Sequence, residues 1–362
     1  MQTWNAKKYG NIFLQSPTIR RYQMTEKREK YRAGVIGCSG VGTRHAMGLV
    51  GLPNVELVAG SDLIQNTLNS FKEKFSEYSN RISGYTNYQE MLLQENLDIV
   101  TVATSDHRHT DPVINAAEIG VKGIFCEKPL ATRLIDADRM IEAVNKNQVI
   151  LSIDHTRRWL PLWVHTKELV LGGKIGDIHY IIGTLGGSRA MLFRNGTHLI
   201  DMICYFANSK PAWVSAELEK GFENYDEYDG DGGHSPNTEP SAHGYIHFEN
   251  GVRGFYVGGP KTTPSRFSLE IVGTSGYINI NDQEAKIYKN NDITPISTPK
   301  WDVIGIEAGV QNLVKMVDQG GEPVSSGNEA LKTVEIIIGF LESQRHHNTK
   351  INLARVRRRM PG

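Results

Sequence analysis

The sequence lacks the features of a secreted, membrane or nucleic-acid-binding protein. Three cysteines in 362 residues, Cys38, Cys126 and Cys204, lie far apart, which argues against a disulfide framework and favours a reducing compartment. No apolar run is long enough for a membrane anchor or a secretory signal, so we expect a cytoplasmic protein. Forty basic residues balance forty acidic ones. We therefore expect a small-molecule partner, with no nucleic-acid and no membrane partner.

Dense charge occurs only in two short runs near the ends of the chain. Residues 25–30 (TEKREK) belong to an N-terminal arm, residues 1–31, and residues 355–359 belong to a basic tail, residues 354–362. Such runs are usually solvated, and the rest of the chain offers no accompanying basic face. We interpret both runs as solvated segments.

The chain from residue 32 shows the rhythm of βαβ units. Apolar runs such as residues 98–103 are nearly continuous, as expected for parallel strands buried on both faces. We predict an N-terminal α/β domain, residues 32–154, with a doubly wound parallel Rossmann sheet. Its strands are predicted at residues 33–36, 55–59, 99–103, 123–126 and 149–153, and its helices at residues 41–50, 67–75, 88–93, 112–119 and 135–145.

A different pattern follows over residues 155–353. A helix, a strand and a second helix precede several strands joined by Gly-containing turns, which predicts an α+β domain with a large, mostly antiparallel sheet. Helices at residues 306–319 and 328–344 would cover this sheet or pack back on the first domain. Residues 223–238, rich in Gly, Asp and Tyr, are predicted as a long loop. Helices on one sheet face leave the other face for a symmetric partner, so we expect a homo-oligomer.

A Gly-rich turn joins the first predicted strand to the first predicted helix. Residues 37–42 read GCSGVG, in the strand–turn–helix context that a dinucleotide fingerprint requires. The helix N-terminus offers backbone N–H groups to a pyrophosphate, and the glycines permit a tight turn and a close approach. Ser39 replaces the second glycine of the ideal pattern, and its backbone can still approach a phosphate. We assign the phosphate contact to Gly37, Ser39, Gly40, Val41 and Gly42.

An acidic residue follows the second predicted strand at the expected offset. Asp62 lies twenty residues beyond Gly42, where a carboxylate accepts hydrogen bonds from the adenosine ribose. A carboxylate repels a 2′-phosphate, and Leu63 stands where an arginine would favour one. The alternative role of Asp62 is a helix N-cap. We predict NAD as the cofactor, in preference to NADP.

Five motifs stand out together along the chain. They are residues 37–45 (GCSGVGTRH), 85–92 (YTNYQEML), 98–109 (DIVTVATSDHRH), 126–130 (CEKPL) and 196–201 (GTHLID). With these motifs the chain resembles the Gfo/Idh/MocA oxidoreductase family over residues 32–353. The resemblance implies NAD or NADP as cofactor, a sugar, polyol or related carbonyl substrate, and a second domain with an open sheet.

The Glu127-Lys128-Pro129 segment follows the strand predicted at residues 123–126, at the sheet edge where open α/β sheets bind ligands. A lysine ammonium there can stabilise a developing alkoxide. The resemblance implies that Lys128 is catalytic and that Glu127 lies beside the cofactor.

The segment after the strand predicted at residues 99–103 also carries site residues. Thr104, Ser105 and His109 match the family's segment beside the nicotinamide ribose, although Ser105 and Asp106 replace Pro and Asn. His107 and His109 lack a third ligand at recognisable spacing, so we predict no metal.

The second catalytic segment departs from the family pattern. Arg194 stands where many relatives have an aspartate, whereas His198 remains and is our candidate general base. The alternative is a histidine that merely begins a helix. Arg194, Asn195 and Asp201 are assigned to substrate binding, and Asp201 is also placed to orient the His198 ring.

A further substrate segment follows the strand predicted at residues 149–153. His155 and Arg158 match the family's substrate-contacting positions, and Trp159 could face a sugar ring. The alternative is an interdomain salt bridge beside a buried tryptophan. Phe222 and Tyr228 in the long loop could close over a substrate or simply pack.

These residues predict an enzyme that oxidises a secondary hydroxyl. A base removes the hydroxyl proton, Lys128 stabilises the alkoxide, and hydride passes to the nicotinamide ring. Inositols, sugars and glycosides oxidised at C3 are all compatible, with glycosides favoured by the long aromatic loop. Two alternatives stay open: a glycoside hydrolase or lyase that retains its NAD, and a non-catalytic NAD-binding regulator.

Overall fold

The computed structural model describes residues 30–79 and 81–359. Residues 1–29 of the N-terminal arm and the last three residues of the basic tail therefore lie outside the described residues. The described part of the tail belongs to the helix α10 (Leu353–Arg359), which follows the two-residue strand β15 (Ile351–Asn352).

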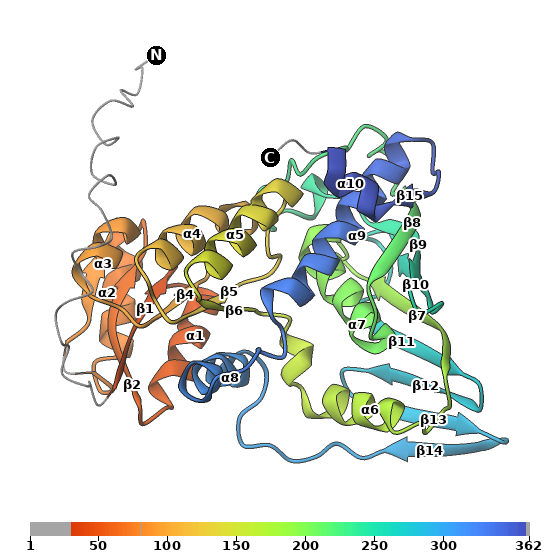
Figure 1. The fold of residues 1–362 in the computed structure, drawn as a ribbon, viewed down its shortest axis with the longest axis horizontal. Helices are drawn as coiled ribbons and strands as arrows, with labels where there is room; N and C mark the ends of the chain where they lie inside the picture. Colours follow the sequence, from red (N-terminus) through yellow and green to blue (C-terminus); the bar gives the residue numbers. More distant parts are fainter. Residues whose placement is uncertain (1–29, 80, 360–362) are drawn as a thin grey trace.

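The first sheet has six parallel strands in the order β3-β2-β1-β4-β5-β6 (Figure 1). This order reverses between β1 and β4, so the strand ends on either side of that point frame a ligand crevice. The strands are β1 (Tyr31–Ile36), β2 (Val55–Ser61), β3 (Ser83–Tyr85), β4 (Ile99–Val102), β5 (Gly123–Cys126) and β6 (Ile150–Ile153). The helices are α1 (Gly40–Val50), α2 (Gln65–Lys74), α3 (Tyr88–Gln94), α4 (Thr110–Glu118) and α5 (Leu134–Lys146). The predicted Rossmann sheet is confirmed.

The second sheet has nine strands in the order β14-β13-β12-β11-β7-β10-β9-β8-β15, and only β7 and β10 pair in parallel among them. The mostly antiparallel sheet is thus also confirmed. Its other strands are β7 (Ile178–Gly186), β8 (Pro211–Leu218), β9 (Ala242–Phe248), β10 (Arg253–Gly258), β11 (Arg266–Gly273), β12 (Gly276–Asn281), β13 (Ala285–Lys289) and β14 (Asp292–Ile296).

Helices α6 (Pro161–Leu171), α7 (Thr197–Ala207) and α9 (Gly327–Arg345) lie on one side of this sheet (Figure 1). Helix α8 (Gly305–Gln319) crosses to the other domain instead: Ile306, Val310 and Leu313 join the apolar core formed by β1, β2 and α1. The apolar core is therefore shared between segments far apart in the sequence. Within the described residues, no helix combines the length and the apolarity needed to cross a bilayer.

Candidate active site

The Gly-rich turn lies between β1 and α1, and its glycines are sterically required. Gly37 has φ of +88°, and a Cβ at Gly42 would overlap the carbonyl oxygen of Gly37. Ser39 is the exposed N-cap of α1 and makes no side-chain capping bond, so its side chain occupies no N–H group of the first turn. Gly40 is also exposed, and Val41 is half-buried. This cradle fits the pyrophosphate of a dinucleotide.

Asp62 follows β2 and is tied to the same turn. One carboxylate oxygen accepts from the backbone N–H of Cys38 at 2.9 Å and the other from Ile64 at 3.0 Å. A carboxylate offers about four acceptor positions, so two remain for ribose hydroxyls. The N-cap of α2 is Ile64, not Asp62. Asp62 therefore lies directly beside the Gly-rich turn.

The segment after β4 is fastened to the segment after β5 by a buried histidine. The ring nitrogens of His109 face the carbonyl oxygens of Pro129 at 2.8 Å and Thr104 at 3.2 Å. Burial lowers the pKa of His109. A neutral ring donates to only one of these carbonyl oxygens. Since the ring is 1% exposed and both nitrogens face the backbone, we assign His109 a structural role in place of the expected cofactor contact. Ser105 is half-buried, whereas His107 is exposed.

Lys128 lies at the carboxyl end of β5 and is almost entirely buried, with 6% of its surface exposed. Its Nζ donates to the carbonyl oxygen of Arg194 at 3.4 Å. Burial lowers the pKa of Lys128, and the nearby carboxylates of Asp106 and Glu127 oppose that effect. The ammonium therefore lies near one carboxylate of its own segment, Glu127, and one from the segment after β4, Asp106.

His198 lies in the first turn of α7, with a partly exposed ring whose Nδ1 is buried without a partner among the described residues. Burial, followed by the positive charges of Lys128 and Arg157, lowers the pKa of His198 well below its usual value. His198 is therefore neutral near pH 7 and able to accept a proton.

Arg194 lies in the π-helical turn Leu192–Gly196 that precedes α7. Its guanidinium pairs with the Asp106 carboxylate at 3.0 Å. It also contributes to the lowered pKa of His198, after the larger effects of burial and the other cations. Asn195, in the same turn, is half-buried. The fold thus supplies an acid, Asp106, from the first domain next to the arginine of the second.

Arg158 and Asp201 form a buried ion pair behind the site. The Asp201 carboxylate accepts from Arg158 Nε at 3.0 Å and from Nη2 at 2.8 Å, and Arg158 Nη1 donates to the carbonyl oxygen of Val324. His155 Nδ1 lies 3.3 Å from the same carboxylate. With 3% and 0% exposure and these contacts filled, Arg158 and Asp201 form a structural ion pair within residues 155–353, which corrects the expectation that they bind substrate.

Three further expectations are corrected in the same region. Asp201 engages Arg158 and His155, so it does not orient His198. His155 is fully buried, and burial lowers its pKa to about 4. Trp159 is buried against Phe125, with ring centroids 5.8 Å apart, rather than facing a sugar.

The sequence gives no motif for Glu239, which the structure places near Lys128 and Asp106. Its Oε2 accepts from the backbone N–H of Phe193 at 3.2 Å, and its Oε1 is buried without a partner among the described residues. Burial and the Asp106 charge raise the pKa of Glu239 to about 7. No spacing signal marks this residue, because it follows an irregular loop.

The long loop between β8 and β9 packs against the candidate site. A Cβ at Gly232 would lie 2.9 Å from Cβ of Ser105, and a Cβ at Gly233 would lie 2.7 Å from Cδ of Arg194. The Tyr228 ring packs on Phe193, with centroids 4.9 Å apart. The loop therefore lies at the edge of the site, and Tyr228 packs on the turn that carries Arg194.

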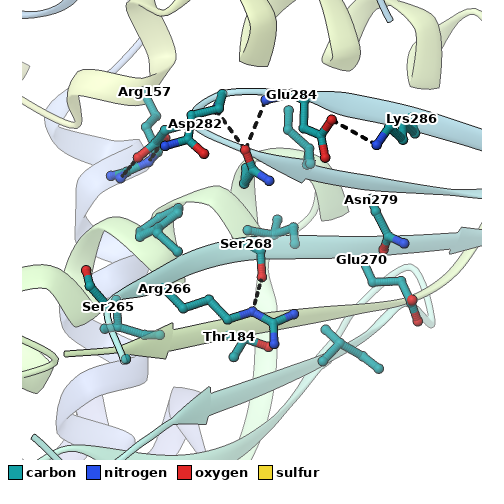
Figure 2. Close-up of a pocket in the computed structure, with 18 of the residues that line it drawn as sticks. Arg157, Thr184, Ser265, Arg266, Ser268, Glu270, Asn279, Asp282, Glu284 and Lys286 are labelled. Atoms are coloured by element: carbon teal, nitrogen blue, oxygen red, sulfur yellow. Dashed lines mark hydrogen bonds and ion pairs between the residues drawn. The ribbon is translucent and has the colours of Figure 1, made fainter. Parts of the chain in front are cut away.

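A polar cavity of about 770 Å³ lies on the second sheet and touches the site at Asn195 and Arg157. Figure 2 shows its walls on β7, β11, β12 and β13, with Arg157 paired to Asp282 and Lys286 paired to Glu284. The cavity lies apart from the Gly-rich turn of the first domain and its lining is rich in hydroxyl, amide and carboxylate groups.

Comparisons with known proteins agree with this arrangement. Residues 31–155 match the model of an oxidoreductase family with an NAD-binding Rossmann fold, and residues 163–279 match the GFO/IDH/MocA C-terminal domain. A myo-inositol 2-dehydrogenase of Thermotoga maritima is 37% identical over 150 residues, 41% of this chain and 43% of that protein. An inositol 2-dehydrogenase of Salmonella typhimurium is 29% identical over 187 residues, 49% of this chain and 54% of that protein.

The chain spans about half the length of these curated relatives. A levoglucosan dehydrogenase structure with NADH and levoglucosan shares the fold at a TM-score of 0.74 and 19% identity, covering 90% of this chain and 99% of that one. The two family models together match most of the chain and fall in both domains. The chain therefore belongs to the Gfo/Idh/MocA family of oxidoreductases and carries an NAD-binding Rossmann domain.

Proposed function

We propose that the protein oxidises a secondary hydroxyl of a sugar, glycoside or inositol and transfers the hydride to NAD. The observation that carries this proposal is the buried Lys128 ammonium at the carboxyl edge of the Rossmann sheet, close enough to His198 for its charge to lower the pKa of that ring. The relatives named for inositol and levoglucosan oxidation support the substrate class.

In the proposed mechanism, each residue has one task. Gly37 to Gly42 and Asp62 would hold the dinucleotide, which supplies the hydride acceptor. His198 accepts the hydroxyl proton, since its lowered pKa leaves the ring unprotonated. The Lys128 ammonium donates a hydrogen bond to the developing alkoxide in a site shielded from water, where such an interaction is strong.

We further propose a glycoside as the preferred substrate, with oxidation at C3. Support comes from the loop that packs against Ser105 and Arg194, whose Tyr228 offers an aromatic face near the site. Asn195, in the same turn as Arg194, adds an amide that can bind a hydroxyl group. Together they would accommodate a second ring.

A substrate panel tests the proposal directly. Purified protein with NAD is offered inositols, free sugars and matched methyl and aryl glycosides, and NADH absorbance is followed. We expect NADH with at least one substrate, and a higher kcat/KM for a glycoside than for its free sugar. Glycoside cleavage without net NADH would favour the enzyme that retains NAD, and NAD binding without any turnover would favour the regulator.

A further inference from the structure

A buried group of three side chains lies directly behind Lys128. His45 Nε2, on α1, lies 3.3 Å from Oε1 of Glu127 and 4.0 Å from Oδ2 of Asp154. Glu127 and Asp154 follow neighbouring strands whose last residues, Cys126 and Ile153, pair with each other, so the two carboxyl groups are placed side by side. All three are at most 8% exposed.

Two carboxyl groups in hydrogen-bond contact cannot both be ionised without strong repulsion. Glu127 and Asp154 are in such contact: one carboxyl oxygen of each and a ring nitrogen of His45 all lie within 4.8 Å of one another. The hydrogen bond from His45, followed by the Lys128 charge, lowers the pKa of Glu127 to about 2, whereas burial, followed by the Glu127 charge, raises the pKa of Asp154. Asp154 Oδ1 already accepts from the Thr156 hydroxyl at 3.0 Å. Without a proton between the acids, Asp154 Oδ2 would be buried with no partner among the described residues.

We propose that His45, Glu127 and Asp154 form a proton-sharing triad that positions Lys128. Asp154 stays protonated and donates a hydrogen bond to the Glu127 carboxylate. His45 donates a second hydrogen bond, from its Nε2–H, to the same carboxylate. Glu127 thus stays ionised next to the Lys128 ammonium and offsets the cost of burying it. Asp154 and His45 are positioning residues, since they act through Glu127.

Other charges also face this group, and the test must separate them. Besides the triad, the ionisable groups near Lys128 are those of Asp106, Glu239, Arg194, His155 and His198. The ionisable groups near the triad are those of Arg44, Cys126 and His109. Asp106 and Arg194 pair with each other. Glu127 is the carboxylate joined directly to Lys128 in the chain.

Infrared spectroscopy tests the shared proton without any turnover. At pH 7 we expect the carbonyl band of a protonated carboxyl group in the wild type, and its loss in Asp154→Asn. Glu239→Gln is the matched control: Glu239, whose pKa is raised to about 7, is partly protonated at this pH, so that variant should remove the Glu239 band and leave the Asp154 band in place. A wild-type spectrum from which Asp154→Asn removes no such band would overturn the triad, as would a stoichiometric divalent metal ion that is lost in Asp154→Asn.

The consequence for Lys128 rests on the proposed function and is tested by pH–rate profiles. Activity is lost as pH rises through the pKa of Lys128. Glu127→Gln removes a neighbouring negative charge, so the basic limb should move to lower pH. Asp154→Asn keeps a donor to Glu127 and should move that limb less. Equal shifts would mean that both acids are ionised, and an unmoved limb in both variants would leave the triad without effect on Lys128; either result contradicts the proposal.

Discussion

The Lys128 ammonium donates to the backbone carbonyl oxygen of Arg194 over 3.4 Å, and this contact joins the end of β5 to the turn before α7. The two segments belong to different domains and are 66 residues apart in the chain. The candidate proton acceptor His198 begins the helix after that turn. The contact therefore places the lysine of one domain beside the histidine of the other.

Removal of the Lys128 or the His198 side chain should lower the rate of the chemical step more than the affinity for the cofactor. Lys128→Ala and His198→Ala should each lower kcat by about 10²–10⁴-fold, the usual contribution of general acid–base catalysis. The affinity for NAD, measured by fluorescence titration, should change little. Lys146→Ala and His165→Ala are the matched controls on other helices. Near-normal turnover by either site variant would contradict the mechanism.

Arg194 should influence the acidic limb of the pH–rate profile. His198 must be unprotonated to accept a proton, so activity falls as pH decreases through its lowered pKa. Arg194→Ala removes a positive charge and leaves Asp106 without its partner, and both changes favour protonated His198. The acidic limb should therefore move to higher pH. Arg194→Lys retains the charge and should move it less; an unmoved limb in Arg194→Ala would leave Arg194 a binding or structural residue.

Asp62 should set the preference for NAD. Its carboxylate accepts ribose hydroxyls and repels a 2′-phosphate, so the wild type should show a higher kcat/KM with NAD than with NADP. Asp62→Ala should reduce the ratio of kcat/KM with NAD to kcat/KM with NADP, mostly by lowering the value with NAD. Because Asp62 also accepts from Cys38 N–H, Asp62→Asn serves as a variant that keeps an acceptor and loses the charge. Equal use of both cofactors by the wild type is the result that refutes this role.

The Arg158–Asp201 pair should stabilise the fold only while both partners are present. Arg158→Met leaves a buried carboxylate unpaired and should lower the free energy of unfolding by about 3–5 kcal/mol. Replacing both residues, Arg158→Met with Asp201→Leu, should cost less than that single change. Arg139→Ala, which removes the exposed pair with Asp136, should cost about 0–1 kcal/mol. Urea unfolding gives the free energy of unfolding of all three variants. If Arg158→Met loses no more of this free energy than Arg139→Ala does, the result argues against the structural role.

The face of the second sheet opposite α7 and α9 should bind a second copy of the chain. It carries a row of half-buried aromatic side chains, with Trp213 beside Tyr245 and Tyr245 beside Phe255, at centroid distances of 4.8 and 5.4 Å. Apolar faces of this kind mark interfaces. Phe255→Glu should yield smaller species in sedimentation than the wild type, whereas Leu171→Glu, exposed on α6, should not. A wild-type monomer at micromolar concentration would contradict this expectation.

Local sequence determined the first domain nearly to the residue. Continuous apolar runs between Gly-containing turns predicted β5 at its observed bounds and β1, β2 and β4 to within two residues at each end, because buried parallel strands need such runs. The short strand β3 was not predicted, because its three residues, Ser83–Tyr85, are small or half-exposed and form no apolar run. The Gly-rich turn was readable because its requirement is local: the backbone itself excludes a Cβ at Gly42.

Only the tertiary structure decided which polar residues meet. Arg158 and Asp201 sit on different segments, and nothing in their local pattern distinguishes a substrate contact from a buried ion pair. Glu239 and Asp154 owe their raised pKa values to burial and to carboxylates from other loops, which no window of sequence contains. Charge interactions act through space over several ångströms, so their partners are set by how the two sheets are joined and not by spacing along the chain.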